Sequence, residues 1–313
     1  MPTKDNLHRT DLIIDGFEVD AKTGQQSVIL RLDPERYKYG ESNGGKGYFD
    51  KFDGTFIPND VFKKMFSGMQ GLPIFDSLPK SQDMDLLFES RKQEIRSFLD
   101  GRLGEYQFQD LSEEFLSKLG ESEGRKCVIL SIDIKGSTKM SQELSEKDNA
   151  KIISLFSREM ATLVANFNGL ILKFLGDGLI CYFPEPNFIG MTDNAIFCAS
   201  AMREFILTCL NPLLTQYGLP ELKFRIGLDS GETTKVVVGN QAIKQHTDLI
   251  GYTINLATKI QSLANENEIL LGESTVLNAH TYWRKKIDEI TPPAEWKNID
   301  SKTGHIYKVY KLT

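Results

Sequence analysis

Two aspartates stand where a carboxylate could do chemistry. Asp133 lies near the end of the apolar run CVILSIDI, and Asp177 lies between Gly176 and Gly178 in LILKFLGDGLICYF. Apolar residues crowd both sides of the Gly-Asp-Gly step, which predicts a turn between two buried strands. If these strands are neighbours, both carboxylates reach one sheet edge, where they suit Mg²⁺ or Mn²⁺ together with substrate phosphates. We therefore predict a metal site at Asp133 and Asp177.

The segment after Asp133 adds groups suited to phosphate. Gly136, Ser137 and Thr138 follow at a predicted turn and helix start, where free backbone N–H groups can receive phosphate oxygens. A plainer alternative is that Asp133 caps a helix and that Asp177 only suits a turn. That alternative is reasonable for either aspartate alone, but the two together at these elements favour a functional pair.

The elements that must position these residues follow an alternating pattern. Strand-like runs lie at 127–134, 170–174, 179–183, 222–229 and 268–271, with a last one in HIYKVYKL. Helical spacing of apolar residues covers 141–167, 191–217, 252–264 and 276–286. A polar, Gly-containing arm is expected over 230–247. The order β-α-β-β-α-β favours an α+β fold of ferredoxin-like type, with a mixed sheet covered by helices on one face.

The first 121 residues differ from this pattern and predict a small separate α/β region. Its elements are read as strands in DLIIDGFEV and QSVILRL, a loop in ESNGGKGYFDKFDGTF, a helix in FIPNDVFKKMFSGM, and one or two helices over 83–119. The polar joint GESEGRK places the domain boundary between residues 121 and 122. We assign no chemistry to this region and expect a regulatory or dimer-supporting role.

Composition limits the classes of protein. The chain has 313 residues, 40% of them hydrophobic and 26% charged, which suits a globular protein with a substantial core. Its net charge of −6 argues against broad electrostatic binding to nucleic acid or to an anionic membrane. The polar start MPTKDNLHRT and the lack of an apolar run near about 20 residues predict a cytoplasmic protein without a membrane span. The cysteines lack metal-ligand spacing, which predicts reduced thiols at Cys127, Cys181, Cys198 and Cys209.

Four stretches, in order, resemble the class III nucleotide cyclases. IDIKGSTKMS and KFLGDGLICYF resemble their two metal-binding segments, RIGLDSGE the strand and turn that follow, and DLIGYTINLATKI their substrate and ribose segment. The resemblance implies a cyclase catalytic domain over 122–313 that converts a nucleoside triphosphate to a 3′,5′-cyclic nucleotide and pyrophosphate. It also implies two Mg²⁺ or Mn²⁺ ions and a head-to-tail homodimer with active sites at the interface.

The resemblance also assigns roles to single residues. Asp133, Ile134 and Asp177 match the metal-binding positions. Lys173 and Asp248 match the pair that reads the base in adenylate cyclases.

Three further positions match the part of the family site that handles ribose and phosphate. Asn255 matches the residue that orients the ribose. Lys259 stands where the family usually has an arginine, so the positive charge is kept but the planar fork is lost. Lys302, near the C-terminus, is expected to add a phosphate contact.

The base stays open between two alternatives. Lys173 with Asp248 suits N1 and N6 of adenine, but cytosine offers the same groups at N3 and N4, and uracil fits with a small shift. Guanine fits poorly, because a lysine replaces the glutamate seen in guanylate cyclases. Ala257-Thr258-Lys259 resembles the bacterial cyclases of antiphage systems called Pycsar, whose cyclic UMP or CMP activates a separate effector. An adenylate cyclase and a pyrimidine cyclase are both expected candidates, and Lys259 leaves a catalytically dead regulatory module as a third.

Overall fold

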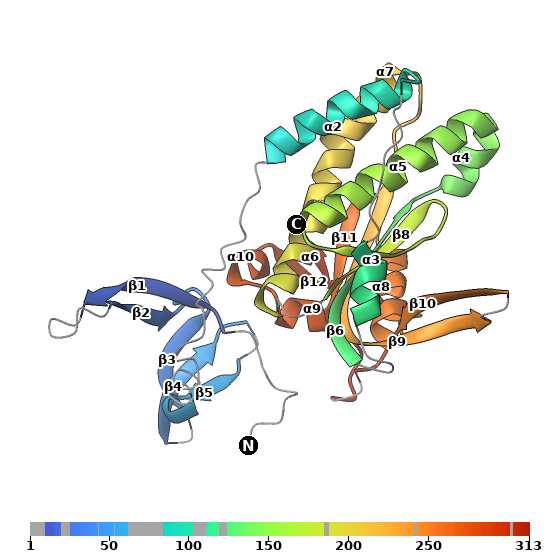
Figure 1. Ribbon diagram of the computed structural model, residues 1–313. Helices are drawn as coiled ribbons and strands as arrows, with labels where there is room; N and C mark the ends of the chain where they lie inside the picture. Colours follow the sequence, from blue (N-terminus) through green and yellow to red (C-terminus); the bar gives the residue numbers. More distant parts are fainter. Residues whose placement is uncertain are drawn as a thin grey trace. The chain divides into compact units, whose positions relative to one another are not determined.

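The protein is described here by a computed structural model. It describes residues 10–19, 26–42, 44–52, 54–61, 84–102, 111–118, 124–184, 188–240, 243–300 and 303–313. The chain divides into two compact units (Figure 1). The first unit comprises Met1–Leu78 with Ala279–Lys285, and the second comprises Pro79–Asn278 with Lys286–Thr313.

The second unit begins well before the predicted boundary at residue 122. Helices α2 (Met84–Leu99) and α3 (Leu111–Lys118) both pack on it. The buried Arg91 of α2 forms a two-point ion pair with Glu159, at 2.8 and 2.9 Å, and Glu159 is itself fully buried. Because each charge would be costly to bury alone, this pair fixes α2 to the unit.

The first unit consists of two small antiparallel sheets. Strands β1 (Leu12–Val19) and β2 (Gln26–Leu32) pair as expected, while β3 (Tyr37–Ser42), β4 (Gly45–Asp50) and β5 (Phe56–Pro58) form a second sheet.

The prediction of a loop over ESNGGKGYFDKFDGTF is therefore wrong. This segment supplies β4, because its aromatic rings pack against neighbouring strands. The ring centroids of Tyr39 and Tyr48 lie 5.1 Å apart, and those of Phe49 and Phe56 lie 4.8 Å apart. A Cβ on Gly47 would lie 2.3 Å from the Ile57 carbonyl oxygen, so glycine is needed for this approach. The helix expected from Phe56 is replaced at its start by β5, and most of it lies outside the described residues.

Within the first unit, a buried ion network connects the N-terminal residues to the late segment Ala279–Lys285. Arg36 donates to Asp11 at 2.9 Å and to Asp50 at 2.7 Å, and all three are buried. Thr281, at the start of α10 (Thr281–Arg284), donates its hydroxyl to Asp11 at 2.9 Å. These contacts explain why residues 279–285 fold with the first unit.

The second unit is built on a mixed sheet in the order β12-β13-β11-β9-β6-β8-β7, and β10 pairs with β9. The β9–β11 pair is parallel, and the other pairs are antiparallel. Its strands are β6 (Gly124–Ile134), β7 (Leu170–Phe174), β8 (Gly178–Pro184), β9 (Phe224–Asn240), β10 (Lys244–Ile250), β11 (Glu268–Gly272), β12 (Ile287–Ile290) and β13 (Val309–Leu312). The predicted α+β fold with a mixed sheet is confirmed.

Helices cover both faces of this sheet rather than the one expected. Ile129 and Tyr182 point to the face where they cluster with Ala257 of α8 and with α3. Phe183 points the other way, toward Val164 of α5 across Gly169. Figure 1 shows α3 and α8 together, apart from α2, α5 and α6. The helices are α4 (Ser137–Glu143), α5 (Glu146–Asn166), α6 (Phe188–Phe205), the π-helical η2 (Ile206–Leu210), α7 (Asn211–Gln216), α8 (Tyr252–Leu263) and α9 (Glu273–Leu277).

Two predicted helices are interrupted in the structure. The one over 141–167 is split into α4 and α5 at Ser145, whose hydroxyl accepts the Asp148 N–H at 3.1 Å and so starts a new helix. The one over 276–286 is split into α9 and α10, because the His280 ring accepts the Tyr282 N–H at 3.1 Å and caps α10.

The arm expected over 230–247 is a pair of strands. β9 runs on to Asn240 and β10 returns beside it, since TTKVVV is rich in β-branched residues that favour strands.

One helix among the described residues, Gly190–Gln216, is long and apolar enough to cross a membrane, and 61% of its apolar window is buried inside the structure. All four cysteines are buried thiols that form no disulfide.

Candidate active site

Asp133 and Asp177 lie at the same end of neighbouring strands. Asp133 on β6 stands opposite Gly178 on β8, and the Ile134 N–H donates to the Asp177 carbonyl at 3.0 Å. A Cβ on Gly178 would lie 2.5 Å from the Ile132 carbonyl oxygen, so only glycine allows this approach. The structure thus brings the two predicted metal-binding aspartates together, while their role as ligands stays a prediction.

An arginine that the sequence did not single out holds Asp133. Arg225, near the start of β9, stands opposite Asp133 in register. Its guanidinium donates to both carboxylate oxygens, with N–O distances of 2.6 and 3.1 Å. Both side chains are 24% exposed, so an ion can reach them from solvent: a cation at Asp133 or an anion at Arg225. In the sequence, Arg225 is noticeable as an arginine near the start of an apolar strand. Its partner Asp133 is seen only from the register of β9 with β6.

The residues at this sheet end fit a cation that takes part of its ligands from the protein and the rest from a substrate. The described residues hold no group of three or more His, Cys, Asp or Glu side chains around one point. Two carboxylates and the Ile134 carbonyl are hard oxygen donors, but they are too few to enclose Mg²⁺ alone. Mg²⁺ commonly binds through one or two carboxylates and completes its shell with water and substrate phosphates.

The predicted turn and helix start after Asp133 are present. Gly136 has φ of 81°, a left-handed conformation that favours glycine, and α4 begins at Ser137. No side chain among the described residues caps this helix start. Ser137 is half-buried and Thr138 is exposed. The backbone at Gly136, Ser137 and Thr138 is therefore accessible to a phosphate, and the predicted phosphate contacts there stay a prediction.

The two residues expected to read the base are in direct contact. Lys173 Nζ lies 3.1 Å from Asp248 Oδ2, although 75 residues separate them in the chain. The other oxygen of Asp248 accepts the Leu249 N–H at 2.9 Å, which fixes the carboxylate. The Lys173 side chain is 39% exposed and that of Asp248 is 16% exposed. A cation donor and an anion acceptor thus stand side by side at the surface.

Asn255 and Lys259 share the outer face of α8. They are four residues apart and both are exposed, so their side chains lie next to each other along the helix. Lys259 Nζ and the Tyr252 hydroxyl each donate to Asn298 Oδ1 at 3.2 Å. The further phosphate-binding candidate, Lys302, lies outside the described residues.

Comparison with known proteins identifies the domain that holds these clusters. The family described as "Adenylate and Guanylate cyclase catalytic domain" matches residues 121–295, more than half of the chain. The chain belongs to this family. The resemblance drawn from the four sequence stretches is confirmed, and so is the α+β cyclase fold.

Among curated relatives of this cyclase-family chain are two cytidylate cyclases. The one from Staphylococcus aureus is 28% identical over 227 residues, covering 70% of this chain and 53% of the relative. The one from Escherichia coli is 26% identical over 203 residues, covering 59% and 43%. An adenylate cyclase from Anabaena cylindrica is 27% identical over 168 residues, covering 51% and 32%. The chain spans about half, or less, of the length of these curated relatives.

Solved cyclase structures share the fold. The guanylyl cyclase Cya2 aligns with a TM-score of 0.53 and 21% identity, covering 62% of this chain and 94% of its own. The adenylyl cyclase CyaB from P. aeruginosa aligns with a TM-score of 0.53 and 22% identity, covering 62% and 96%.

A buried carboxyl supports the helix that carries Asn255 in this cyclase domain. Asp229 on β9 is 2% exposed and accepts the Thr253 hydroxyl at 2.9 Å and the Tyr307 hydroxyl at 2.7 Å. A Cβ on Gly272 would lie 2.2 Å from Asp229, so the carboxyl fills the space that a side chain there would need. β9, α8 and the C-terminal segment therefore meet at one acid.

Asp229 gives the cyclase domain a predictable dependence on pH. Burial raises the pKa of Asp229 from 3.8 to about 7, against the opposing effect of its hydrogen bonds. The folded state therefore holds a proton that the unfolded chain releases, and this contribution to stability is lost as the pH rises from about 4 toward 7. We therefore compare the free energies of unfolding of Asp229→Asn and of the parent by chemical denaturation. As the pH rises from about 5 to about 8, we expect the difference in favour of Asp229→Asn to grow by on the order of 2 kcal/mol. The exposed Asp288→Asn is the control, and a difference from the parent that stays constant with pH would contradict this.

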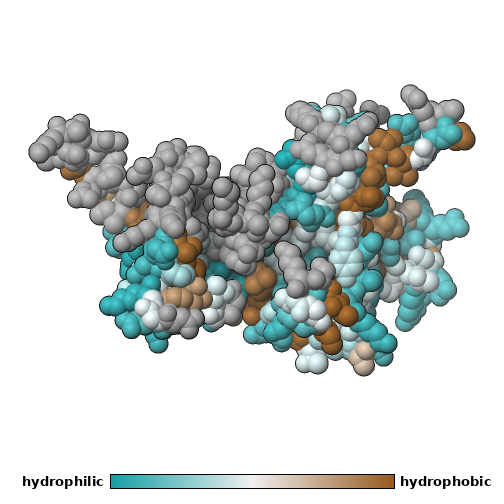
Figure 2. All heavy atoms as spheres, turned by 90° about the horizontal axis from the view of Figure 1, so that it is seen from below, coloured by the Kyte–Doolittle hydropathy of each residue, from teal (hydrophilic) through white to brown (hydrophobic). Residues whose placement is uncertain are grey.

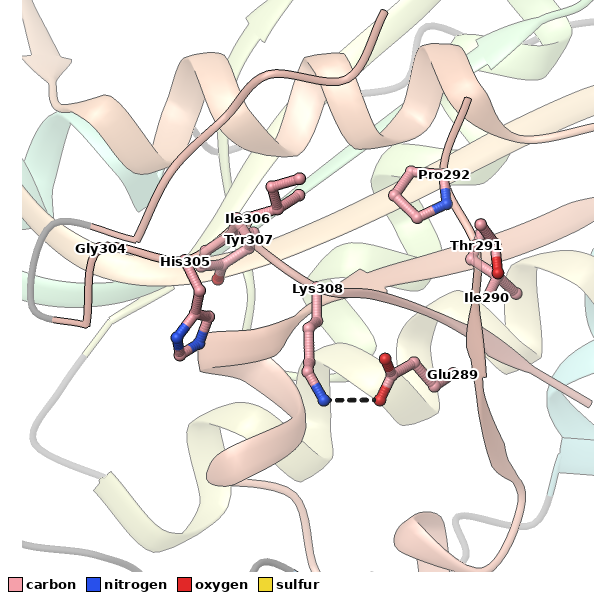
Figure 3. Close-up of a pocket in the computed structure, with 9 residues that line it drawn as sticks. All are labelled: Glu289, Ile290, Thr291, Pro292, Gly304, His305, Ile306, Tyr307 and Lys308. Atoms are coloured by element: carbon pink, nitrogen blue, oxygen red, sulfur yellow. Dashed lines mark hydrogen bonds and ion pairs between the residues drawn. The ribbon is translucent and has the colours of Figure 1, made fainter. Parts of the chain in front are cut away.

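A cavity of about 660 Å³ lies elsewhere in the cyclase unit (Figure 3). Its lining residues come from β12 and the segment before β13, and they include none of the described candidate residues. Lys308 on its wall is paired with Glu289 at 2.9 Å. The candidate site is therefore not this cavity but the surface clusters around Asp133, Lys173 and α8.

Proposed function

We propose that this chain is a nucleotide cyclase that converts a nucleoside triphosphate to a 3′,5′-cyclic nucleotide and pyrophosphate. The observation that carries the proposal is the convergence of Asp133 and Asp177 at paired strand ends, within a cyclase-family domain. In the reaction, the ribose 3′-oxygen bonds to the α-phosphorus, and the bond from that phosphorus to the β-phosphate oxygen breaks.

Each cluster has a task in this proposal. Asp133 and Asp177, with the Ile134 carbonyl, would hold Mg²⁺ or Mn²⁺, which when bound neutralises the triphosphate and activates the 3′-hydroxyl. Arg225 already pairs with Asp133, so it can turn to a phosphate oxygen when a cation takes that carboxylate. Asn255 would orient the ribose.

Lys259 would place a positive charge near the transferring phosphorus. Its Nζ donates to Asn298 Oδ1 at 3.2 Å. As a lysine it acts as a point charge and lacks the fork of the usual arginine, so the dead regulatory module is the main alternative to an active enzyme. Cyclic product from the purified chain would reject that alternative.

We propose CTP as the preferred substrate. Two cytidylate cyclases are among the curated relatives. The pair of Lys173 and Asp248 can donate to N3 of cytosine and accept from its N4 amino group. The same pair fits N1 and N6 of adenine, and an adenylate cyclase is also a relative, so ATP is the second candidate.

Reversing the charge of Lys173 tests the base assignment. In Lys173→Glu two carboxylates face the base and neither donates to its ring nitrogen, so we expect kcat/KM for CTP to fall about 10- to 100-fold. The ratio of kcat/KM between CTP and the other triphosphates should change as well. Lys147→Glu, an exposed lysine of α5, is the matched control. Unchanged base ratios in Lys173→Glu would remove this residue from base recognition.

We also propose that the enzyme works as a homodimer with shared sites. Apolar side chains beside the candidate residues are exposed in the single chain: Phe174 by 53%, Leu175 by 49% and Tyr252 by 57%. Figure 2 shows that one face of the molecule carries apolar patches, drawn in brown, among polar surface. A second copy that covers these side chains would bury them at the active site.

We propose a biological setting on the basis of the Pycsar resemblance alone. A cyclic pyrimidine nucleotide made in the cytoplasm would serve as a signal in antiphage defence, read by a separate effector protein. A regulatory or dimer-supporting role for the N-terminal unit stays a prediction.

A further inference from the structure

Helix α3 bridges the two strands that carry Lys173 and Asp248. Its Ser112 hydroxyl donates to the Ile171 carbonyl of β7 at 2.6 Å, two residues before Lys173. Its Leu116 is 5% exposed and belongs to the apolar cluster that contains Leu249, the residue after Asp248. The helix ends at Lys118 and so precedes the residues that match the cyclase family.

Ser112 binds at the point where β7 is irregular. Ile171 pairs with Cys181, but Lys173 pairs with Ile180, so Leu172 is an extra residue between two consecutive partners. Such a bulge changes which face the following side chain points to.

The bulge decides the direction of Lys173. In a regular ladder Lys173 would oppose Leu179, whose side chain points to the face of α5, opposite to that of Ile180. With the bulge Lys173 opposes Ile180 and points to the face on which it meets Asp248. The contact at 3.1 Å therefore depends on the extra residue that lies beside Ser112.

We propose that α3 is the element that positions the base-reading pair. Ser112 holds the bulge that turns Lys173 toward Asp248, and Leu116 packs α3 against β10 beside Asp248. Both are positioning residues, since the base would contact Lys173 and Asp248 and not α3. This inference rests on the proposed function of that pair.

The experiment compares Ser112→Ala and Leu116→Ala in the full-length chain, with kcat and KM measured for ATP, GTP, CTP and UTP. We expect each variant to raise KM for the preferred triphosphate about 3- to 10-fold and to narrow the preference among bases. The Mn²⁺ concentration for half-maximal rate should not change, because the contacts given above for Ser112 and Leu116 lie at Ile171 and in the apolar cluster with Leu249, and not at Asp133 or Asp177.

Controls separate positioning from general stability. Ser117→Ala removes an exposed hydroxyl of the same helix, and Leu99→Ala removes a buried leucine of α2, which is 6% exposed. Both should keep the base preference of the parent even where Leu99→Ala lowers Tm. If Leu116→Ala fails to fold, Ser112→Ala decides the question alone.

Two results would overturn the inference, and they are distinguishable. If Lys173→Glu changes the base ratios but Ser112→Ala keeps those of the parent, α3 does not position the pair. If Lys173→Glu itself leaves the ratios unchanged, the base-reading role fails and the inference fails with it.

Discussion

Asp177→Ala is expected to abolish cyclase turnover, with kcat in Mn²⁺ falling more than about 100-fold. The carboxylate stands at the sheet end beside Asp133, and without it a bound cation would lose one of the two aspartates placed there. Asp133→Ala should have the same effect and should in addition leave Arg225 without its two-point partner. Both variants are measured with saturating triphosphate, so that a change in KM alone does not mimic the loss.

Asp177→Asn and Asp288→Ala complete this test. The first keeps the volume of the turn residue and removes its charge, so it should be nearly as inactive as Asp177→Ala. The second removes an exposed carboxylate from β12 and should retain parental activity. Full activity of purified Asp133→Ala or Asp177→Ala would refute the assignment of the metal site.

Mixing two inactive variants should restore activity if each site takes residues from two copies. One copy would supply Asp133 and Asp177, and the other would supply Lys173, Asp248 and Asn255. In a mixed dimer of Asp177→Ala with Asn255→Ala, one site holds both changes and the other holds neither. With random exchange at equal amounts, half of the dimers are mixed and half of their sites are intact, so about a quarter of parental activity should return.

Native mass spectrometry must show the mixed dimers before the rate is interpreted. Each variant incubated alone is the control and should stay inactive. Mixed dimers that show no activity would mean that each site is built within one copy, and a chain that stays monomeric during turnover would reject the homodimer.

The sequence predicts the central strands well because their signal is local. CVILSIDI and the two apolar runs around Gly176-Asp177-Gly178 appear as β6, β7 and β8, and the two aspartates meet as expected. Local patterns mislead where glycine and polar residues interrupt runs of β-branched ones, so the sequence predicts an arm over 230–247 where the structure has the end of β9 and strand β10.

What the sequence could not supply depends on pairing between distant residues. Arg225 and Asp133 are 92 residues apart and meet only through the register of β9 with β6. Ser112 reaches Ile171 across 59 residues, at a bulge that leaves no mark in the sequence. The register of strands and the packing of α3 are tertiary properties, so the neighbours of each candidate residue had to come from the structure.

The central claim is tested most directly by incubating the purified full-length chain with Mn²⁺ and each of ATP, GTP, CTP and UTP, and identifying the products by mass. We predict 3′,5′-cyclic CMP and pyrophosphate from CTP. Cyclic AMP as the main product would support the assignment as a nucleotide cyclase but would replace CTP by ATP as the preferred substrate. No cyclic nucleotide from any of the four, with protein shown to be folded, would contradict the proposal that this chain is a nucleotide cyclase.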